Sequence, residues 1–225
     1  MAPSRFDDKI LSYGDVVLRR SDLRILSGPF FINDRLIEFF FAHLSSSDGD
    51  DADRHLLLVP PSISFWLSNC PDGSLLLEAA APLRLRDRDL VLFTVNNNSD
   101  VALAEGGTHW SLLVYERADN VFVHHDSCGG LNLAHARRLY DAVKAFVCHD
   151  GGVPAFVEGP TPQQKNGYDC GVYVMAAARV ICQWFEEGKA EGKWFEALEA
   201  AMGEKTAANL RLEVLSLISS LGGLC

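Results

Sequence analysis

The sequence has no apolar run long enough to cross a membrane, since a spanning helix needs about 20 consecutive apolar residues. Its N-terminus, from Met1 to Asp8, also lacks the apolar segment of a secretory signal peptide. Basic residues are few, with 20 Lys and Arg against 30 Asp and Glu. Because phosphate binding needs clustered basic side chains, we expect no nucleic-acid surface. We also expect no membrane association and a location in the cytoplasm or nucleus.

Paired cysteines are also absent, because none of the six is spaced as C-x-x-C. No short-spaced cluster of Cys and His predicts a zinc site, and the chain is too long for a small disulfide-dense domain. We therefore expect free thiols in a reducing compartment and no bound metal or cofactor. The cysteines are Cys70, Cys128, Cys148, Cys170, Cys182 and Cys225.

Apolar residues make up 48% of the 225 residues, enough to bury one sizeable core, and no linker divides the chain. A single domain over residues 1–225 is therefore predicted. Apolar strands are grouped in the middle of the sequence with helical segments around them, which indicates an α+β fold. The segments 45–53 and 96–107 are predicted to be exposed loops. The predicted strands are 90–95, 110–115, 121–125 and 155–157, and the main predicted helices are 34–44, 62–68, 134–147, 170–185 and 209–221.

Cys170 lies in the sequence Gly167-Tyr168-Asp169-Cys170-Gly171, directly before a long apolar segment typical of a buried helix. A cysteine at a helix N-terminus faces the positive end of the helix dipole, which favours the nucleophilic thiolate. The flanking glycines are expected to let a substrate backbone approach. Position alone does not settle the role, since a free cysteine is usually a small buried apolar residue.

His109 and Asp126 are candidates for the base and for the group that orients it. His109 precedes one predicted strand, Asp126 follows the next, and the polar segment 116–120 between the strands predicts a hairpin. Both side chains then lie at the end of the hairpin opposite the turn, where the carboxylate can hold one imidazole nitrogen. His124 and His125 are alternative bases, but both fall inside the predicted strand.

Gln164 is a candidate donor for the oxyanion that acyl transfer creates, because it lies on the Pro-rich loop before Cys170. The backbone N–H of Cys170 is a second candidate donor. Gln163 competes with Gln164 for this role, and either glutamine could equally be a loop residue that faces solvent.

Three blocks of sequence together resemble a known family: Gly107-Thr108-His109-Trp110-Ser111-Leu112-Leu113-Val114-Tyr115, His125-Asp126-Ser127, and Gln163-Gln164-Lys165-Asn166-Gly167-Tyr168-Asp169-Cys170-Gly171-Val172-Tyr173-Val174. Their order and spacing resemble those of the ubiquitin-like-protein-specific cysteine proteases, also called Ulp or sentrin-specific proteases, which are related to adenovirus protease. The resemblance implies a papain-like α+β fold whose mixed or antiparallel central sheet is flanked by helices. Other segments resemble the deneddylase branch, which acts on the Nedd-type (Rub) modifier: 11–13, 18–22, 32–37, 95–99 and 155–158.

This resemblance assigns a role to each candidate. It implies that Cys170 is the nucleophile, His109 the general base, Asp126 the residue that orients it and Gln164 the oxyanion donor. It also implies that Trp110 covers a narrow channel for the Gly-Gly tail of the modifier, because glycines alone lack the side chains that a tight channel excludes.

Two further residues are expected on the opposite wall of that channel. Phe31 stands where the family usually has a second Trp, so the wall stays aromatic but lacks the indole N–H. Asp34 is a candidate partner for an Arg of the modifier tail, or equally a first-turn carboxylate at the start of a helix.

The resemblance implies hydrolysis of a peptide or isopeptide bond after Gly-Gly, with the Nedd-type (Rub) modifier and its conjugates as partners. Cullins are the expected conjugates, and a monomer is expected. The acidic net charge of −10 favours encounter with a basic surface. Three other functions stay open: a SUMO-specific protease, an acyltransferase on the same scaffold, and a non-catalytic modifier-binding module.

Overall fold

A five-stranded mixed sheet lies at the centre of the computed structural model, which describes residues 7–46, 55–103, 106–148, 152–188 and 193–223. In spatial order its strands are β3 (Leu56–Val59), β4 (Leu90–Asn96), β5 (Trp110–Glu116), β6 (Val121–His125) and β7 (Ala155–Glu158). The edge strands β3 and β7 run parallel to their neighbours, and the three central strands are antiparallel. A separate hairpin pairs β1 (Lys9–Tyr13) with β2 (Val16–Arg19). The predicted α+β architecture is confirmed.

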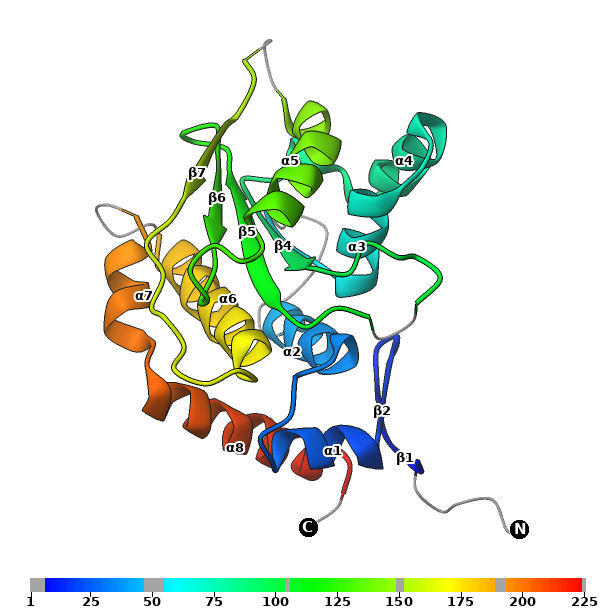
Figure 1. The fold of residues 1–225 in the computed structure, drawn as a ribbon, viewed down its shortest axis with the longest axis vertical. Helices are drawn as coiled ribbons and strands as arrows, with labels where there is room; N and C mark the ends of the chain where they lie inside the picture. Colours follow the sequence, from blue (N-terminus) through cyan, green and yellow to red (C-terminus); the bar gives the residue numbers. More distant parts are fainter. Residues whose placement is uncertain (1–6, 47–54, 104–105, 149–151, 189–192, 224–225) are drawn as a thin grey trace.

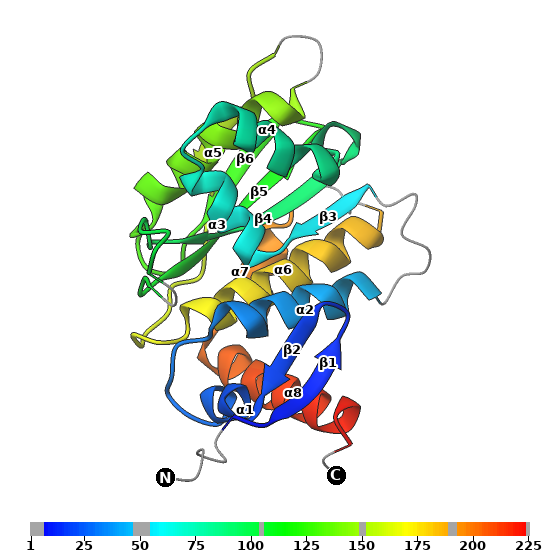
Figure 2. The same cartoon turned by 90° about the vertical axis from the view of Figure 1, so that its right-hand side faces the viewer.

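Helices cover both faces of the sheet (Figures 1 and 2). One face carries α3 (Pro61–Asn69), α4 (Gly73–Ala80) and α5 (Leu133–Val147), with the short 3-10 helices η2 (Ala81–Leu83) and η3 (Leu85–Asp87) beside them. The other face carries α2 (Asp34–Ser46) and α6 (Cys170–Glu186). Outside α6 lie α7 (Phe195–Ala201) and α8 (Glu204–Leu221), and α8 also contacts α1 (Arg20–Leu26).

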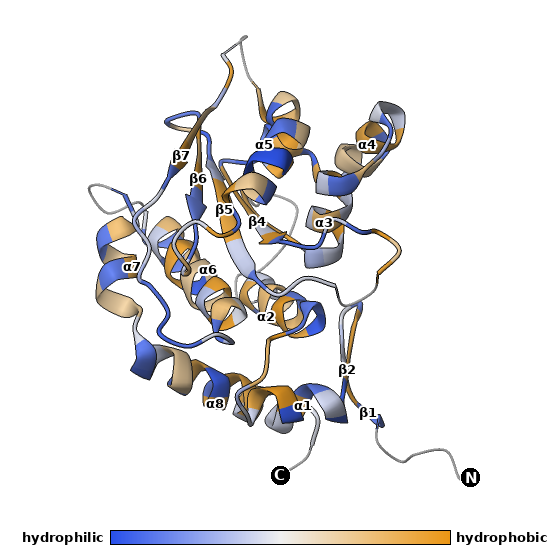
Figure 3. Cartoon of the chain, viewed as in Figure 1, coloured by the Kyte–Doolittle hydropathy of each residue, from blue (hydrophilic) through white to orange (hydrophobic). Residues whose placement is uncertain are grey.

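The continuous apolar sequence of β4 feeds two cores, one on each face of the sheet. Leu90 and Leu92 belong to the core that α2, α6 and α8 share, whereas Val91 and Phe93 belong to the core under α3 and α5. Successive side chains of a strand point to opposite faces, so a strand covered on both faces reads as an unbroken apolar run. Figure 3 shows apolar residues along the central strands and along α6.

The elements that carry the candidate residues begin and end close to the predicted positions. β5 begins at Trp110 and β6 ends at His125, which aligns with Leu112 across the hairpin, so the predicted hairpin is confirmed. α6 begins at Cys170, near the end of the sheet at which β5 starts (Figure 1). Cys170 therefore lies near His109 and Asp126, at the open end of the β5–β6 hairpin.

Some elements differ from the sequence prediction. The sequence pattern gave no sign of the β1–β2 hairpin, and α2 extends to Ser46, past the predicted start of a loop at Ser45. The hydroxyl groups of Tyr13 and Ser46 are 2.6 Å apart, and this hydrogen bond between β1 and the last turn of α2 accompanies the longer helix. Residues 47–53 of the predicted loop lie outside the described residues. None of the helices in the described ranges combines the length and apolar character needed to span a bilayer.

Candidate active site

His109 lies between Cys170 and Asp126 at the start of α6. Its Nε2 atom is 2.6 Å from Asp126 Oδ1, and the neighbouring Cys170 side chain helps to raise the pKa of its imidazole. The structure therefore brings together the three residues that the sequence pattern paired, in the order nucleophile, imidazole and carboxylate.

Asp126 is held in place from the loop that follows β6. Its Oδ1 accepts the backbone N–H of Cys128 at 2.8 Å, and its Oδ2 accepts the backbone N–H of Asn132 at 2.8 Å. Burial alone would raise the pKa of Asp126, but the hydrogen bonds from His109 and from these two backbone groups outweigh burial and lower it. The carboxylate is therefore ionised while it holds the imidazole.

The electrostatics of the site favour a protonated His109. Burial alone would lower its pKa, but the hydrogen bonds and negative charges of Asp126 and Cys170 raise the pKa of His109 to about 9. At neutral pH the imidazole thus carries a proton beside the sulfur. This arrangement places a proton donor beside the candidate nucleophile.

The loop before β5 positions the backbone of His109. Asn97 Oδ1 accepts the backbone N–H groups of Thr108 and His109, at 2.7 and 3.1 Å. Gly107 has a φ of +85°, and a Cβ added there would collide with the side chain of Asn96. Asn97 is the middle residue of the three asparagines that the sequence pattern marks as a loop. Its side chain therefore fixes the backbone position of His109.

Asn132 is a positioning residue with no functional sign in the sequence. Its side chain is fully buried, and its Nδ2 atom donates to the carbonyl oxygens of Val95 and His109 and to Ser111 Oγ. Its backbone N–H holds Asp126. Asn132 therefore connects the Asp126 carboxylate to the backbone carbonyls of Val95 and His109. A signal that could have found it is its place just after the Gly129-Gly130 turn that follows Asp126.

The two alternative bases, His124 and His125, form hydrogen bonds with residues other than Cys170 and Asp126. His124 is fully buried between Glu158 and Ser111, with contacts of 2.8 and 2.9 Å. His125 accepts the indole N–H of Trp194 at 2.8 Å, and burial lowers the pKa of His125 to about 3. Both imidazoles are bound to residues outside the Cys170–Asp126 pair, which leaves His109 as the candidate base.

The two glutamines before α6 also differ in their contacts. Gln163 uses both ends of its amide, because it donates to the carbonyl oxygens of Asp126 and Thr161 and accepts the N–H of Gly129. Gln164 accepts the Ser127 hydroxyl at 2.7 Å and donates one N–H to the carbonyl of Asn166. An amide nitrogen carries two hydrogens, so Gln164 keeps one N–H without an acceptor among the described residues. This supports Gln164 over Gln163 as the oxyanion donor, which stays a prediction.

The residues predicted to line the channel lie on two joined segments. Trp110 is partly buried, and its indole N–H donates to the carbonyl of Ile32 at 2.9 Å. That bond links the start of β5 to the segment before α2, where Phe31 is 49% exposed and Asp34 is exposed. The exposed phenyl ring is available to a ligand. Asn33 Oδ1 accepts the backbone N–H of Leu36 at 3.0 Å, so Asn33 caps α2 and Asp34 does not have to.

Gly171 has a different role from the one its sequence position suggests. A Cβ added at Gly171 would lie 2.6 Å from Ile32 Cβ, so the missing side chain makes room for Ile32 and not for a substrate backbone. Gly167 has nothing within 4 Å of an added Cβ. The close contact packs the first turn of α6 against the segment that accepts the Trp110 N–H.

No group of three or more His, Cys, Asp and Glu side chains within the described ranges could hold a metal ion. The cysteines in these ranges form no disulfide: Cys70, Cys128, Cys148, Cys170 and Cys182. Cys225 lies outside the described residues.

Comparison with known proteins gives consistent matches. A family model described as the Ulp1 protease family, C-terminal catalytic domain, matches residues 81–205. The chain is 51% identical to NEDD8-specific protease 1 of Arabidopsis thaliana over 219 residues, which are 96% of this chain and 94% of that protein. It is 38% identical to Sentrin-specific protease 8 of Homo sapiens over 182 residues, 80% of this chain and 84% of that protein.

Among solved structures, the C-terminal Ulp1 protease domain in complex with Smt3, the yeast ortholog of SUMO, superposes with a TM-score of 0.70. The match covers 97% of this chain and 90% of that chain, at 21% sequence identity. At this level of identity the likeness concerns the fold alone, and it confirms the fold that the sequence blocks predict.

Proposed function

Because the chain belongs to the Ulp1 protease family, we propose that it hydrolyses the bond after the C-terminal Gly-Gly of a NEDD8-type modifier. The observation that carries this proposal is the placement of His109 between Cys170 and Asp126 at the start of α6. The choice of modifier rests on the curated relatives, which are named as NEDD8-specific and sentrin-specific proteases and match over most of their length.

The proposed reaction proceeds through a thioester. The Cys170 thiolate attacks the glycine carbonyl carbon, and the carbonyl oxygen becomes an oxyanion that Gln164 and the backbone N–H of Cys170 stabilise. His109 gives its proton to the leaving amine as the C–N bond breaks. His109 then takes a proton from water as the water oxygen attacks the thioester, which releases the modifier carboxylate and restores Cys170.

The channel residues give a physical basis for the Gly-Gly requirement. The bond from Trp110 to Ile32 holds the indole against the segment that carries Phe31, so a tail between the two aromatic walls must lack side chains. Asp34, exposed in the first turn of α2, adds a negative charge to this segment. This charge favours a basic residue in the modifier tail.

We propose two kinds of substrate that share this bond. An isopeptide substrate is a protein carrying the modifier on a lysine, and cullins are the expected example. A peptide substrate is an unprocessed modifier precursor. We further propose that the enzyme acts as a monomer, as a single domain over residues 1–225, in the cytoplasm or nucleus.

We expect Trp110→Phe to raise KM about 5- to 10-fold with a smaller change in kcat. The phenyl ring keeps an apolar lid but cannot donate to the carbonyl of Ile32, and a hydrogen bond contributes about 1 kcal/mol. Steady-state hydrolysis of a fluorogenic modifier conjugate measures both constants. Trp66→Phe is the matched control, because Trp66 lies on α3 on the other face of the sheet and should leave both constants unchanged. Equal KM values for Trp110→Phe and wild type would remove Trp110 from the channel wall.

A panel of C-terminal electrophile probes tests the proposed function directly. We expect a NEDD8 probe to label Cys170 about 10²-fold faster or more than SUMO and ubiquitin probes, since specificity is a ratio of kcat/KM values. Mass spectrometry of the labelled peptide identifies the residue. Faster labelling by the SUMO probe would assign the chain to the SUMO-specific proteases. Labelling by acyl-CoA with none by the probes would indicate an acyltransferase.

A further inference from the structure

Arg211 is a buried residue of the C-terminal helix α8, and its side chain reaches the loop that precedes Cys170. Arg211 and Asp169 are each 7% exposed. The Arg211 guanidinium binds Asp169 Oδ1 through Nε at 2.8 Å and through Nη2 at 2.7 Å. Buried charges persist in proteins when they are paired and hydrogen-bonded, so this pair is built into the interior beside the nucleophile.

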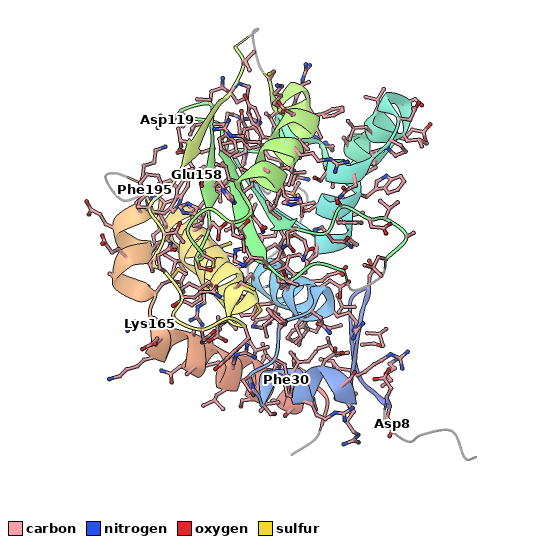
Figure 4. The ribbon with its side chains drawn as sticks, viewed as in Figure 1. Asp8, Phe30, Asp119, Glu158, Lys165 and Phe195 are labelled. Atoms are coloured by element: carbon pink, nitrogen blue, oxygen red, sulfur yellow. The ribbon has the colours of Figure 1, made fainter. Side chains whose placement is uncertain are left out.

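The same guanidinium holds the segment that leads to the channel wall. It donates to the carbonyl oxygens of Ile25, at 3.0 Å, and Phe30, at 2.8 Å. Phe30, labelled in Figure 4, lies beside α1 near α8 and comes just before Phe31 and Ile32 in the chain. Arg211 therefore joins the loop of the nucleophile to the wall opposite Trp110. A planar guanidinium can make these bonds at once, whereas a lysine ammonium acts as a point charge.

Asp169 occupies the N-cap position of α6, but its side chain accepts no hydrogen bond from the first turn of the helix. An aspartate at this position ordinarily accepts the N–H of the second or third helical residue. Here Oδ1 faces Arg211, and Oδ2 accepts the Asn166 side-chain amide at 2.6 Å. The carboxylate is thus turned away from the end of the helix that carries Cys170.

From this geometry we propose that Arg211 is a positioning residue for the cleavage reaction, an inference that rests on the proposed function. By holding the Asp169 carboxylate aside, Arg211 leaves the positive end of α6 and the N–H of Cys170 to the thiolate and the oxyanion. Without Arg211, the carboxylate would cap α6 and place a negative charge beside the sulfur. The matched family model ends at residue 205, before Arg211.

Charged groups lie on two sides of the Cys170 sulfur. The His109 imidazole and the Asp126 carboxylate lie on the side of the sheet, and the Asp169–Arg211 pair lies on the side of the helices. Removal of Arg211 changes the charge on the helix side and leaves the sheet side as it is. His109 interacts with Cys170, and Arg211 and Tyr173 interact with Asp169. One step further out, Asp126 binds His109, and Glu204 interacts with Tyr173 and pairs with Lys165.

The rate of Cys170 alkylation by iodoacetamide as a function of pH tests the proposal. In Arg211→Met we expect the pH midpoint of alkylation to rise by about one unit, because a negative charge approaches the thiolate. Adding Asp169→Asn to Arg211→Met should return the midpoint to the wild-type value. Peptide mass spectrometry follows Cys170, and the exposed thiol of Cys128 is an internal control whose midpoint should not move.

Kinetics of the folded variants complete the test. Arg211→Lys keeps the charge but loses the bonds to the carbonyls of Ile25 and Phe30, so we expect an unchanged alkylation midpoint and a raised KM. If Arg211→Met does not fold, Arg211→Gln carries the measurement, since its amide still donates inside the pocket. An unshifted midpoint in a folded variant without the charge would overturn the proposal and leave Arg211 a purely structural role. Alkylation needs no modifier, so this result is independent of whether NEDD8 is the substrate.

Discussion

Cys170→Ala should lower kcat/KM for cleavage after Gly-Gly by about 10⁵- to 10⁶-fold, the loss expected when the nucleophile of a catalytic triad is removed. Without the sulfur, His109 and Asp126 have no thiolate to pair with, and water alone must attack the carbonyl. The variant should still fold, because Cys170 is a single small residue on a helix that contributes many other side chains to the core. It should also still bind the modifier, since the proposed channel walls do not involve the sulfur. Hydrolysis of a fluorogenic conjugate and calorimetric binding measure the two properties.

Cys182→Ala is the matched control for this experiment. Cys182 is 3% exposed and lies on the same helix α6, so the substitution removes the same atom from a comparably buried place. It should leave kcat/KM unchanged. Cleavage by Cys170→Ala at the wild-type rate would show that another group is the nucleophile. A wild-type protein that binds NEDD8 without cleaving any conjugate would be a modifier-binding module.

The parts of the site that the sequence predicted depend on local patterns. The largely apolar runs 110–115 and 121–125 marked β5 and β6, and the short polar turn between them predicted a hairpin, which brings His109 and Asp126 to the same end. The apolar segment after Cys170 similarly predicted the start of α6. In each case, neighbours in the sequence determine where the functional side chain lies.

The parts that the sequence did not predict depend on contacts between distant segments. Arg211 contacts Asp169 and Phe30, which are remote from it in the chain, and no periodic pattern marks a buried arginine. Asn132 and Gly171 are similar cases, since their roles are defined by Val95 and Ile32 on other elements. The sequence around each of these residues is ordinary for a loop or a helix, so their roles become visible only in the tertiary structure.

Asp126→Asn should lower kcat/KM at neutral pH by about 10²- to 10⁴-fold, as in other triads whose orienting carboxylate is replaced by an amide. The loss of activity follows from the hydrogen bonds that the two carboxylate oxygens of Asp126 accept. Oδ1 accepts hydrogen bonds from His109 and from the N–H of Cys128, and Oδ2 accepts the N–H of Asn132. An asparagine whose NH₂ group takes the Oδ2 position loses the bond from Asn132, and one whose NH₂ group takes the Oδ1 position loses the bonds from His109 and Cys128. In both orientations the imidazole loses its negative partner.

The pH profile separates this effect from simple misfolding. In the wild type, His109 has a pKa of about 9, so it is protonated below that pH and can donate to the leaving amine, and kcat/KM should fall as pH rises through about 9. Loss of the carboxylate removes the interactions that raise this pKa, so in Asp126→Asn the alkaline fall should move down by roughly 1–3 pH units. Asp141→Asn, on the outer surface of α5, is the control and should keep the wild-type profile. If Asp126→Asn retained an alkaline fall near the wild-type pH, Asp126 would not be the group that sets the protonation of His109.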